Sequence, residues 1–186
     1  MKKSILALAI STIFIIGCKN EKKEEDKKVE ETVSVEVKKL KLKLEAKSNS
    51  NVTGNVVFTE ENGSVTMTAV MSGLTPGSHA IHLHEKADCS SEDGTSTGGH
   101  WNPTSEPHGI WGASEGYHKG DIGNFEADAN GNGTITFATD QWCIGCGDPN
   151  KDIIGKAVIV HEGTDDFTTQ PTGAAGGRVS CGALIE

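Results

Sequence analysis

The sequence predicts an all-β domain, an antiparallel sandwich or barrel made of short strands. Short β-rich runs recur along the chain, and no stretch shows a sustained helical period. Turn signals such as Asn130-Gly131-Asn132-Gly133 separate these runs, and glycine accounts for 23 of the 186 residues. Short strands with glycine-rich turns between them are typical of sandwiches and barrels.

The strands are expected where apolar and β-branched residues alternate or cluster. Leu40, Leu42 and Leu44 alternate with charged residues, which is the period of a half-buried strand. The other expected strands are residues 52–58, 65–71, 80–84, 134–139, 157–161 and 178–185. Two long stretches, 86–119 and 162–177, lack strand character, and loops of this length inside a compact domain usually carry function.

The first seventeen residues have the pattern of an export signal. Lys2 and Lys3 precede an apolar run over 5–16, which is too short for a membrane span because about twenty apolar residues are needed. The sequence before Cys18 resembles the end of a bacterial lipoprotein leader, with a plain secretory signal as the alternative. We expect an exported protein, lipid-anchored at Cys18 to the cell envelope and facing the periplasm or the cell surface.

After the leader, residues 18–38 are expected to form the lipidated cysteine and a charged tether, and residues 39–186 the folded domain. The tether is rich in Lys, Glu and Asp and has no aromatic residue, so it cannot bury enough apolar surface to fold; a short charged helix is the alternative. The net charge of −9 argues against nucleic acid as a partner. Apart from Cys18, four cysteines remain, an even number that suits an oxidising compartment.

The seven histidines suggest a metal site. His82 and His84 lie two residues apart on an expected strand, so both imidazoles leave the same face of the sheet. Further candidate ligands lie in or beside the long loops: His100, His108, His118, Asp121 and His161. Imidazole suits copper and zinc, and three imidazoles with a carboxylate suit tetrahedral zinc. Spacing alone also fits a generic zinc site, or histidines that share no ion.

Five segments in order resemble the copper–zinc superoxide dismutase family. They read HAIHLHE at 79–85, GGHWNP at 98–103, HKGDIGN at 118–124, VIVHEGTDD at 158–166 and GGRVSCG at 176–182. The resemblance runs from about Leu40 to the C-terminus. It implies an eight-stranded Greek-key barrel that converts superoxide to oxygen and hydrogen peroxide, with copper cycling between Cu(II) and Cu(I).

The resemblance also implies the metal ligands. Copper would be bound by four histidines: His82, His84, His100 and His161. Zinc would be bound by His100, His108, His118 and Asp121, so that His100 bridges the two ions. Because every zinc position is filled, a subtype that binds copper alone is not expected. In the family, the bridging histidine also leaves copper on reduction and passes a proton to the product.

The remaining site roles follow from the same resemblance. Asp165 would join a copper histidine to a zinc histidine through hydrogen bonds, and His79 would pack behind the copper ligands. Arg178, the one arginine of the chain, would attract superoxide to the open copper position. Thr172 would narrow the channel. The second loop is shorter than in eukaryotic relatives and Pro171 stands where they carry a lysine, so the sequence leaves open how the substrate is steered.

The cysteines divide into two pairs. Cys89 and Cys181 match the disulfide of the family. Cys143 and Cys146 lie outside the family pattern, and their spacing alone fits a redox motif, half of a zinc site or a local disulfide. We expect a local disulfide, because no second pair completes a zinc site and no βαβ context supports a thioredoxin fold.

Two other functions compete with dismutation. One is a module on the same fold that stores or delivers copper or zinc without turnover, which loss of Arg178 would have favoured. The other is an adhesin or scaffold, which predicts eroded ligands, and none is eroded. The sequence leaves open whether the protein is a monomer or a homodimer.

Overall fold

The computed structural model describes residues 36–185. The expected leader, the lipidated Cys18 and the tether up to residue 35 lie outside the described residues. Within 36–185, no helix has the length and apolar character needed to cross a bilayer.

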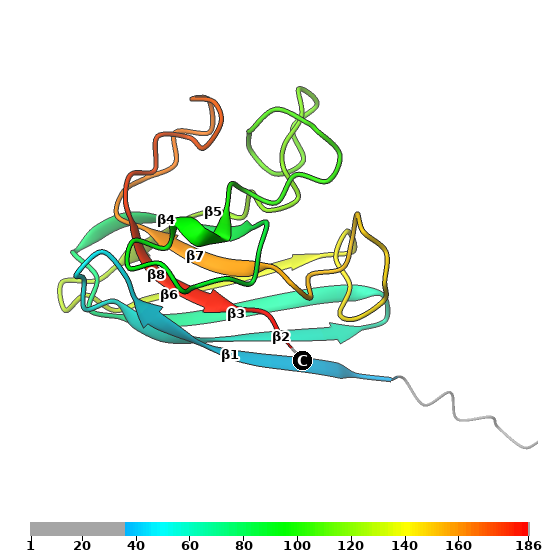
Figure 1. The fold of residues 1–186 in the computed structure, drawn as a ribbon, viewed down its shortest axis with the longest axis horizontal. Coiled ribbons are helices and arrows are strands. Elements are labelled where there is room, and N and C mark those ends of the chain that lie inside the picture. Colours follow the sequence, from blue (N-terminus) through cyan, green and yellow to red (C-terminus); the bar gives the residue numbers. More distant parts are fainter. Residues whose placement is uncertain (1–35, 186) are drawn as a thin grey trace, which may run out of the picture. The chain divides into compact units, whose positions relative to one another are not determined.

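Eight antiparallel strands close into a barrel, in the order β1-β2-β3-β6-β5-β4-β7-β8 (Figure 1). The strands are β1 Lys38–Ala46, β2 Thr53–Glu61, β3 Ser64–Ser72, β4 Gly77–His84, β5 Gly123–Ala127, β6 Gly133–Thr139, β7 Ala157–His161 and β8 Arg178–Ala183. The run β7-β4-β5-β6 has the strand order of a Greek key. The predicted eight-stranded Greek-key fold is therefore confirmed.

Alternation along the strands decides which side chains form the core. In β3, Val65, Met67, Ala69 and Met71 point inward and are at most 2% exposed. The residues between them point outward, as the two-residue period of a strand requires. Because a shift of one residue would turn these side chains into solvent, the pattern also fixes the register of β3 between β2 and β6.

The sequence analysis missed one strand, β5. Gly123, Asn124 and Glu126 are weak strand formers, and only Phe125 and Ala127 are apolar, so the segment has little strand signal of its own. Pairing with β4 at five positions brings it into the barrel. Tertiary contacts thus override local propensity here.

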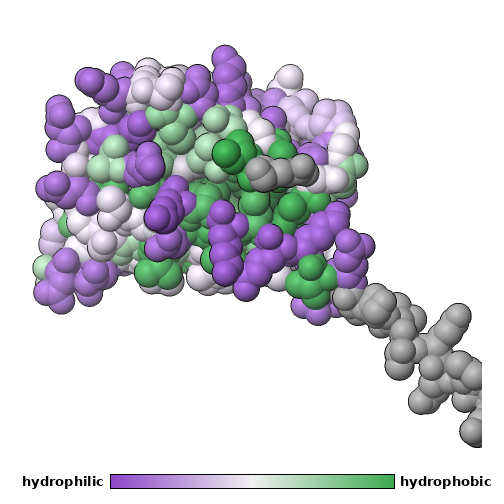
Figure 2. All heavy atoms as spheres, turned by 60° about the horizontal axis from the view of Figure 1, so that its bottom comes forward, coloured by the Kyte–Doolittle hydropathy of each residue, from purple (hydrophilic) through white to green (hydrophobic). Residues whose placement is uncertain are grey.

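Both long loops leave the barrel on the side of β4, β5 and β7, away from β1 (Figure 1). The first loop connects β4 to β5 and contains a single turn of 3-10 helix, η1 Thr95–Thr97. The second connects β7 to β8. Seen from the β1 side, the surface is largely hydrophilic with apolar side chains gathered in its middle (Figure 2).

Two disulfides stabilise the chain, and both predicted pairs are present. Cys89–Cys181 joins the first long loop to β8, and its cysteines are 92 positions apart in the sequence. The cysteines of Cys143–Cys146 are three positions apart, so this disulfide closes a very short loop. Since the entropy removed from the unfolded chain grows with loop length, the first is worth about 4–5 kcal/mol and the second about 2 kcal/mol.

Candidate metal centre

Seven side chains form two buried groups that share His100. The first group is His82, His84, His100 and His161, and the second is His100, His108, His118 and Asp121. Within each group, the potential ligand atoms all lie within 4.8 Å of one another. β4 supplies His82 and His84, β7 ends with His161, and the first long loop supplies the other four.

In the first group, each strand histidine has one ring nitrogen held by a partner outside the group. His82 Nε2 lies 2.9 Å from an Asp165 oxygen. His84 Nδ1 donates to the Gly98 carbonyl at 2.9 Å, and His161 Nδ1 donates to the Gly176 carbonyl at 3.3 Å. These bonds fix which nitrogen faces inward. The Nε2 atoms of His84 and His161 consequently face each other at 3.4 Å.

In the second group, three imidazoles converge on the Asp121 carboxylate. The Nδ1 atoms of His100, His108 and His118 lie 2.8, 2.9 and 3.3 Å from its oxygens. Backbone N–H groups of Gly109 and His118 donate to the same carboxylate at 3.1 and 2.8 Å. Asp121 is therefore oriented by the loop that carries the histidines around it.

Asp165 connects the two groups. One of its oxygens lies 2.9 Å from His82 Nε2 and the other lies 2.9 Å from His108 Nε2. Asn124 of β5 holds the Asp165 backbone, accepting from its N–H and donating to its carbonyl at 2.8 Å each. Gly173 makes room for the carboxylate, because a Cβ there would overlap it.

Burial keeps three histidines of the first group neutral: His84, His100 and His161. Desolvation lowers the pKa of His84 and of His161 well below the usual value, and the charge of neighbouring imidazoles lowers both further. Burial likewise lowers the pKa of His100 to about 4. At neutral pH these rings therefore carry lone pairs available to a metal ion.

In the second group, in contrast, His108 and the carboxylates next to it are charged. Burial acts to lower the pKa of His108, but hydrogen bonds to Asp121 and Asp165 outweigh it and raise the pKa to about 9. Burial also acts to raise the pKa of both carboxyl groups, yet the hydrogen bonds from the histidines hold each well below its usual range. Without a metal ion, this group is a charged hydrogen-bonded network.

Two buried nitrogens, His82 Nδ1 and His100 Nε2, lack a hydrogen-bond partner within the described residues. His108 Nδ1 and His118 Nδ1 lie close to Asp121 but without the direction of a hydrogen bond. Such orphaned groups are rare in folded proteins and call for an explanation, and a bound ion supplies one. The four imidazoles of the first group suit Cu(II), and the three imidazoles and carboxylate of the second suit tetrahedral zinc. The residues present therefore fit both ions.

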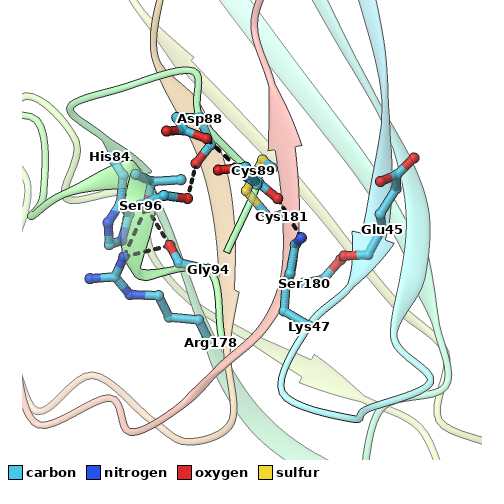
Figure 3. Close-up of a disulfide and its surroundings, with 12 residues drawn as sticks. Glu45, Lys47, His84, Asp88, Cys89, Gly94, Ser96, Arg178, Ser180 and Cys181 are labelled. Atoms are coloured by element: carbon cyan, nitrogen blue, oxygen red, sulfur yellow. Dashed lines mark hydrogen bonds between the residues drawn. A yellow bond between two sulfur atoms is a disulfide. The ribbon is translucent and has the colours of Figure 1, made fainter. Parts of the chain in front are cut away.

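Arg178 braces the first loop beside His84 (Figure 3). Its Nη1 donates to the Gly94 carbonyl and to the Thr97 hydroxyl, and its Nη2 donates to the Gly98 carbonyl, each at 2.8 Å. The Gly98 carbonyl also accepts from His84, so one oxygen links the arginine to a candidate ligand. The Cys89–Cys181 disulfide holds the same loop against β8 (Figure 3).

The other two predicted residues lie at the edges of the site. His79 is buried behind His161, whose carbonyl lies 2.9 Å from His79 Nδ1, while Nε2 lies 2.8 Å from the Thr75 carbonyl. Thr172 lies partly exposed on the second loop. Its narrowing of a channel stays a prediction.

Several positioning residues were not singled out from the sequence. Gly98 and Gly176 offer carbonyls to histidines, and Asn124 holds Asp165. All three lie inside the motifs quoted above, so the signal was present. Gln170 accepts a hydrogen bond from the N–H of His108 and donates one to its carbonyl, each at 2.9 Å. No sequence pattern predicts this role of Gln170.

A sequence profile of the family described as copper/zinc superoxide dismutase (SODC) matches residues 52–184. The chain belongs to this family. Membership and the two buried ligand groups together support binding of copper and zinc in general.

Solved structures with the same fold carry several names. A double mutant of a SOD-like protein from Bacillus subtilis is 32% identical over 78% of this chain and 97% of its own, with a TM-score of 0.70. The SOD-like protein without substitutions is 29% identical over 82% and 100%, with a TM-score of 0.69. The clock protein EA4 is 37% identical over 78% and 92%, with a TM-score of 0.67.

Proposed function

We propose that the protein is a superoxide dismutase. Copper would be bound by His82, His84, His100 and His161, and zinc by His100, His108, His118 and Asp121. The observation that carries the proposal is the sharing of His100 between two complete buried ligand groups, with Asp165 tying them together. A module that needed only to store metal would not require two groups coupled through one imidazole.

When bound, copper supplies an accessible one-electron couple, whereas zinc has none and contributes charge and geometry. The protein keeps His84, His100 and His161 neutral, and hydrogen bonds direct the free nitrogens of His84 and His161 inward. Asp121 and its hydrogen bonds hold the His100 ring from the zinc side. Ring orientation fixed by partners outside the coordination sphere raises metal affinity and defines the tautomer.

Arg178 is the residue proposed to attract superoxide. The domain from residue 39 carries nineteen acidic and nine basic residues, so its distant charges repel an anion. Screening over about 8 Å at physiological salt weakens those distant charges, and a nearby cation is weakened far less. The guanidinium beside His84 would therefore dominate the field close to the site.

One observation favours a second candidate, a metal-binding module without turnover. The structures similar to this chain include proteins named SOD-like and a clock protein, so the fold alone does not assign turnover. The test is superoxide dismutation by the chain from Lys19 to Glu186 loaded with copper and zinc, beside a His161→Ala variant. Fast turnover lost in the variant supports the dismutase, whereas negligible turnover with both ions bound supports the module.

We further propose that the protein is exported and anchored by lipid at Cys18, with superoxide as its small-molecule substrate and no nucleic-acid partner. The leader pattern and the acidic composition support this. Metabolic labelling with a fatty acid tests it, because label should enter the wild-type protein and not a Cys18→Ser variant. Ultracentrifugation of the chain from Lys19 decides between monomer and homodimer.

A further inference from the structure

The outer face of strands β1, β2, β3 and β6 has an unusual composition. The pairing registers place twelve outward-facing side chains in three rows across these strands. The rows are Lys39-Thr59-Thr66-Ala138, Lys41-Val57-Thr68-Thr136 and Lys43-Asn55-Val70-Thr134. We call these twelve residues the β1 face. They comprise three lysines, all on β1, and nine uncharged residues. The exposed acids Glu45 and Glu61 border the face at the ends of β1 and β2.

This composition contrasts with the rest of the domain. From residue 38 onward the chain has ten basic and nineteen acidic residues, and five of the ten basic ones lie within 38–47. That stretch contains one acid, Glu45. Positive charge is thus concentrated on the strand that borders an uncharged sheet face.

The three lysines of the β1 face are available to a partner. All three are exposed, and in the described part of the chain the one lysine–carboxylate ion pair is Lys38–Glu60. Exposed lysine side chains without a carboxylate partner carry positive charge that no neighbouring group of the protein compensates. They therefore offer complementarity to an anionic surface.

Apolar side chains lie directly beside the lysines. β1 pairs with β8 only at Glu45 and Ala46, and the two strands leave a groove of about 330 Å³. Leu42 and Ile185 line this groove together with Lys41, Lys43 and Glu45, and Ile185 is 63% exposed. The apolar patch in the middle of Figure 2 lies on this side of the molecule. Exposed apolar groups next to lysines are what a lipid headgroup region accommodates.

The β1 face also lies opposite the candidate metal centre. β4, β7 and the long loops that supply its ligands lie on the other side of the barrel (Figure 1). A barrel resting on the β1 face would keep the metal centre open to the medium.

We propose that the β1 face docks the barrel on an anionic lipid surface, with Lys39, Lys41 and Lys43 binding headgroup phosphates. The proposal concerns the barrel alone and needs neither dismutation nor a lipid on Cys18. Each lysine near an anionic membrane strengthens binding about fivefold, so the three together contribute about 100-fold. Added salt should weaken the attraction.

The test is co-sedimentation of the chain from Lys19 to Glu186 with vesicles. Phosphatidylcholine vesicles containing phosphatidylglycerol are compared with vesicles of phosphatidylcholine alone. The test variant replaces the three lysines by glutamine: K39Q, K41Q and K43Q. A matched variant makes the same change in net charge elsewhere on the barrel: K86Q, K151Q and K156Q. Both keep the same tether, and thermal unfolding checks that both fold.

Wild type and the matched variant should bind the anionic vesicles, and the test variant should bind about 100-fold more weakly. Absence of wild-type binding would overturn the proposal. Equal loss in both variants would also overturn it, since net charge and not the face would then be responsible. A solution dimer that V70K dissociates would show that a second copy covers the face, and would overturn the proposal too.

Discussion

The two ligand groups meet at one imidazole but are held together by different forces. In the second group, Asp121 accepts from the protein on all sides, and His108 lies between two carboxylates. Opposite charges and hydrogen bonds can assemble this group before any ion arrives. Its geometry is thus a property of the folded loop.

The first group has no carboxylate of its own. His84 and His161 donate to backbone carbonyls, and their inward Nε2 atoms lie 3.4 Å apart. Burial keeps these two rings neutral, so they are held by the barrel and its backbone carbonyls and not by a carboxylate. The second group, which contains a carboxylate, therefore suits an ion of constant charge. The first group, which contains only imidazoles, suits an ion whose charge changes by one.

The largest expected effect comes from removing one ligand of each group. His161→Ala should lower dismutation by at least about 100-fold while zinc stays bound, because His161 belongs only to the first group. His118→Ala should release zinc, retain copper and cost less activity. Metal analysis and dismutation assays on both variants measure this. Loss of both metals from either variant would show that the groups are not separable.

Asp165→Asn should weaken zinc binding by about 10-fold to 100-fold, because the amide can accept from only one of His82 and His108. Competition with a chelator measures the affinity. Asp166→Asn is the matched control, since Asp166 is exposed and bonds only within its own turn. Equal effects from both substitutions would contradict a bridging role for Asp165.

Much of this arrangement could be predicted from the sequence, because alternation and turn signals are local. The alternating leucines predicted β1, and the apolar run with its histidine pair predicted β4. β5 could not be predicted, because its pairing with β4 and not its composition makes it a strand. The motifs gave the ligand types, but which ring nitrogen faces inward depends on carbonyls such as that of Gly98, which only the folded loop places.

Arg178 tests the electrostatics of the first group. Arg178→Glu should lower turnover per bound copper about threefold to tenfold, more at low salt, because attraction of an anion is replaced by repulsion. Turnover is expressed per bound copper because Arg178 also braces the loop at Gly94, Thr97 and Gly98. Lys151→Glu makes the same charge change on an exposed residue of another loop and should have little effect. Unchanged turnover in Arg178→Glu would remove this residue from the mechanism.

A smaller effect is the proton count on metal binding at pH 7. With its pKa raised to about 9, His108 carries a proton in the metal-free protein, so zinc binding should release about one proton. His84 and His161 are already neutral, so copper binding to the metal-free protein should release almost none. The bridging His100 would lose its own N–H proton only to the ion that binds second, so each count is taken on the metal-free protein. Calorimetry in buffers of different ionisation enthalpy measures both counts. Release of the same number of protons by copper and by zinc would contradict the difference in charge between the two groups.

The smallest effect concerns metal-free stability. Because the pKa of His108 is higher in the folded chain than its usual 6.5, its proton stabilises the fold fully below pH 6.5. That contribution is lost as the pH rises through about 9. The unfolding temperature of the metal-free protein should therefore decrease as the pH is raised from 6.5 to about 9. A His108→Gln variant should lack this part of the decrease.

Anomalous X-ray diffraction at the copper and zinc edges, on crystals of the doubly loaded protein, tests the assignment of the two groups most directly. Copper signal confined to the group of His84 and His161, with zinc signal confined to the group of His118 and Asp121, is the predicted result. The same metal in both groups, or copper beside Asp121 and zinc beside His161, would contradict the account.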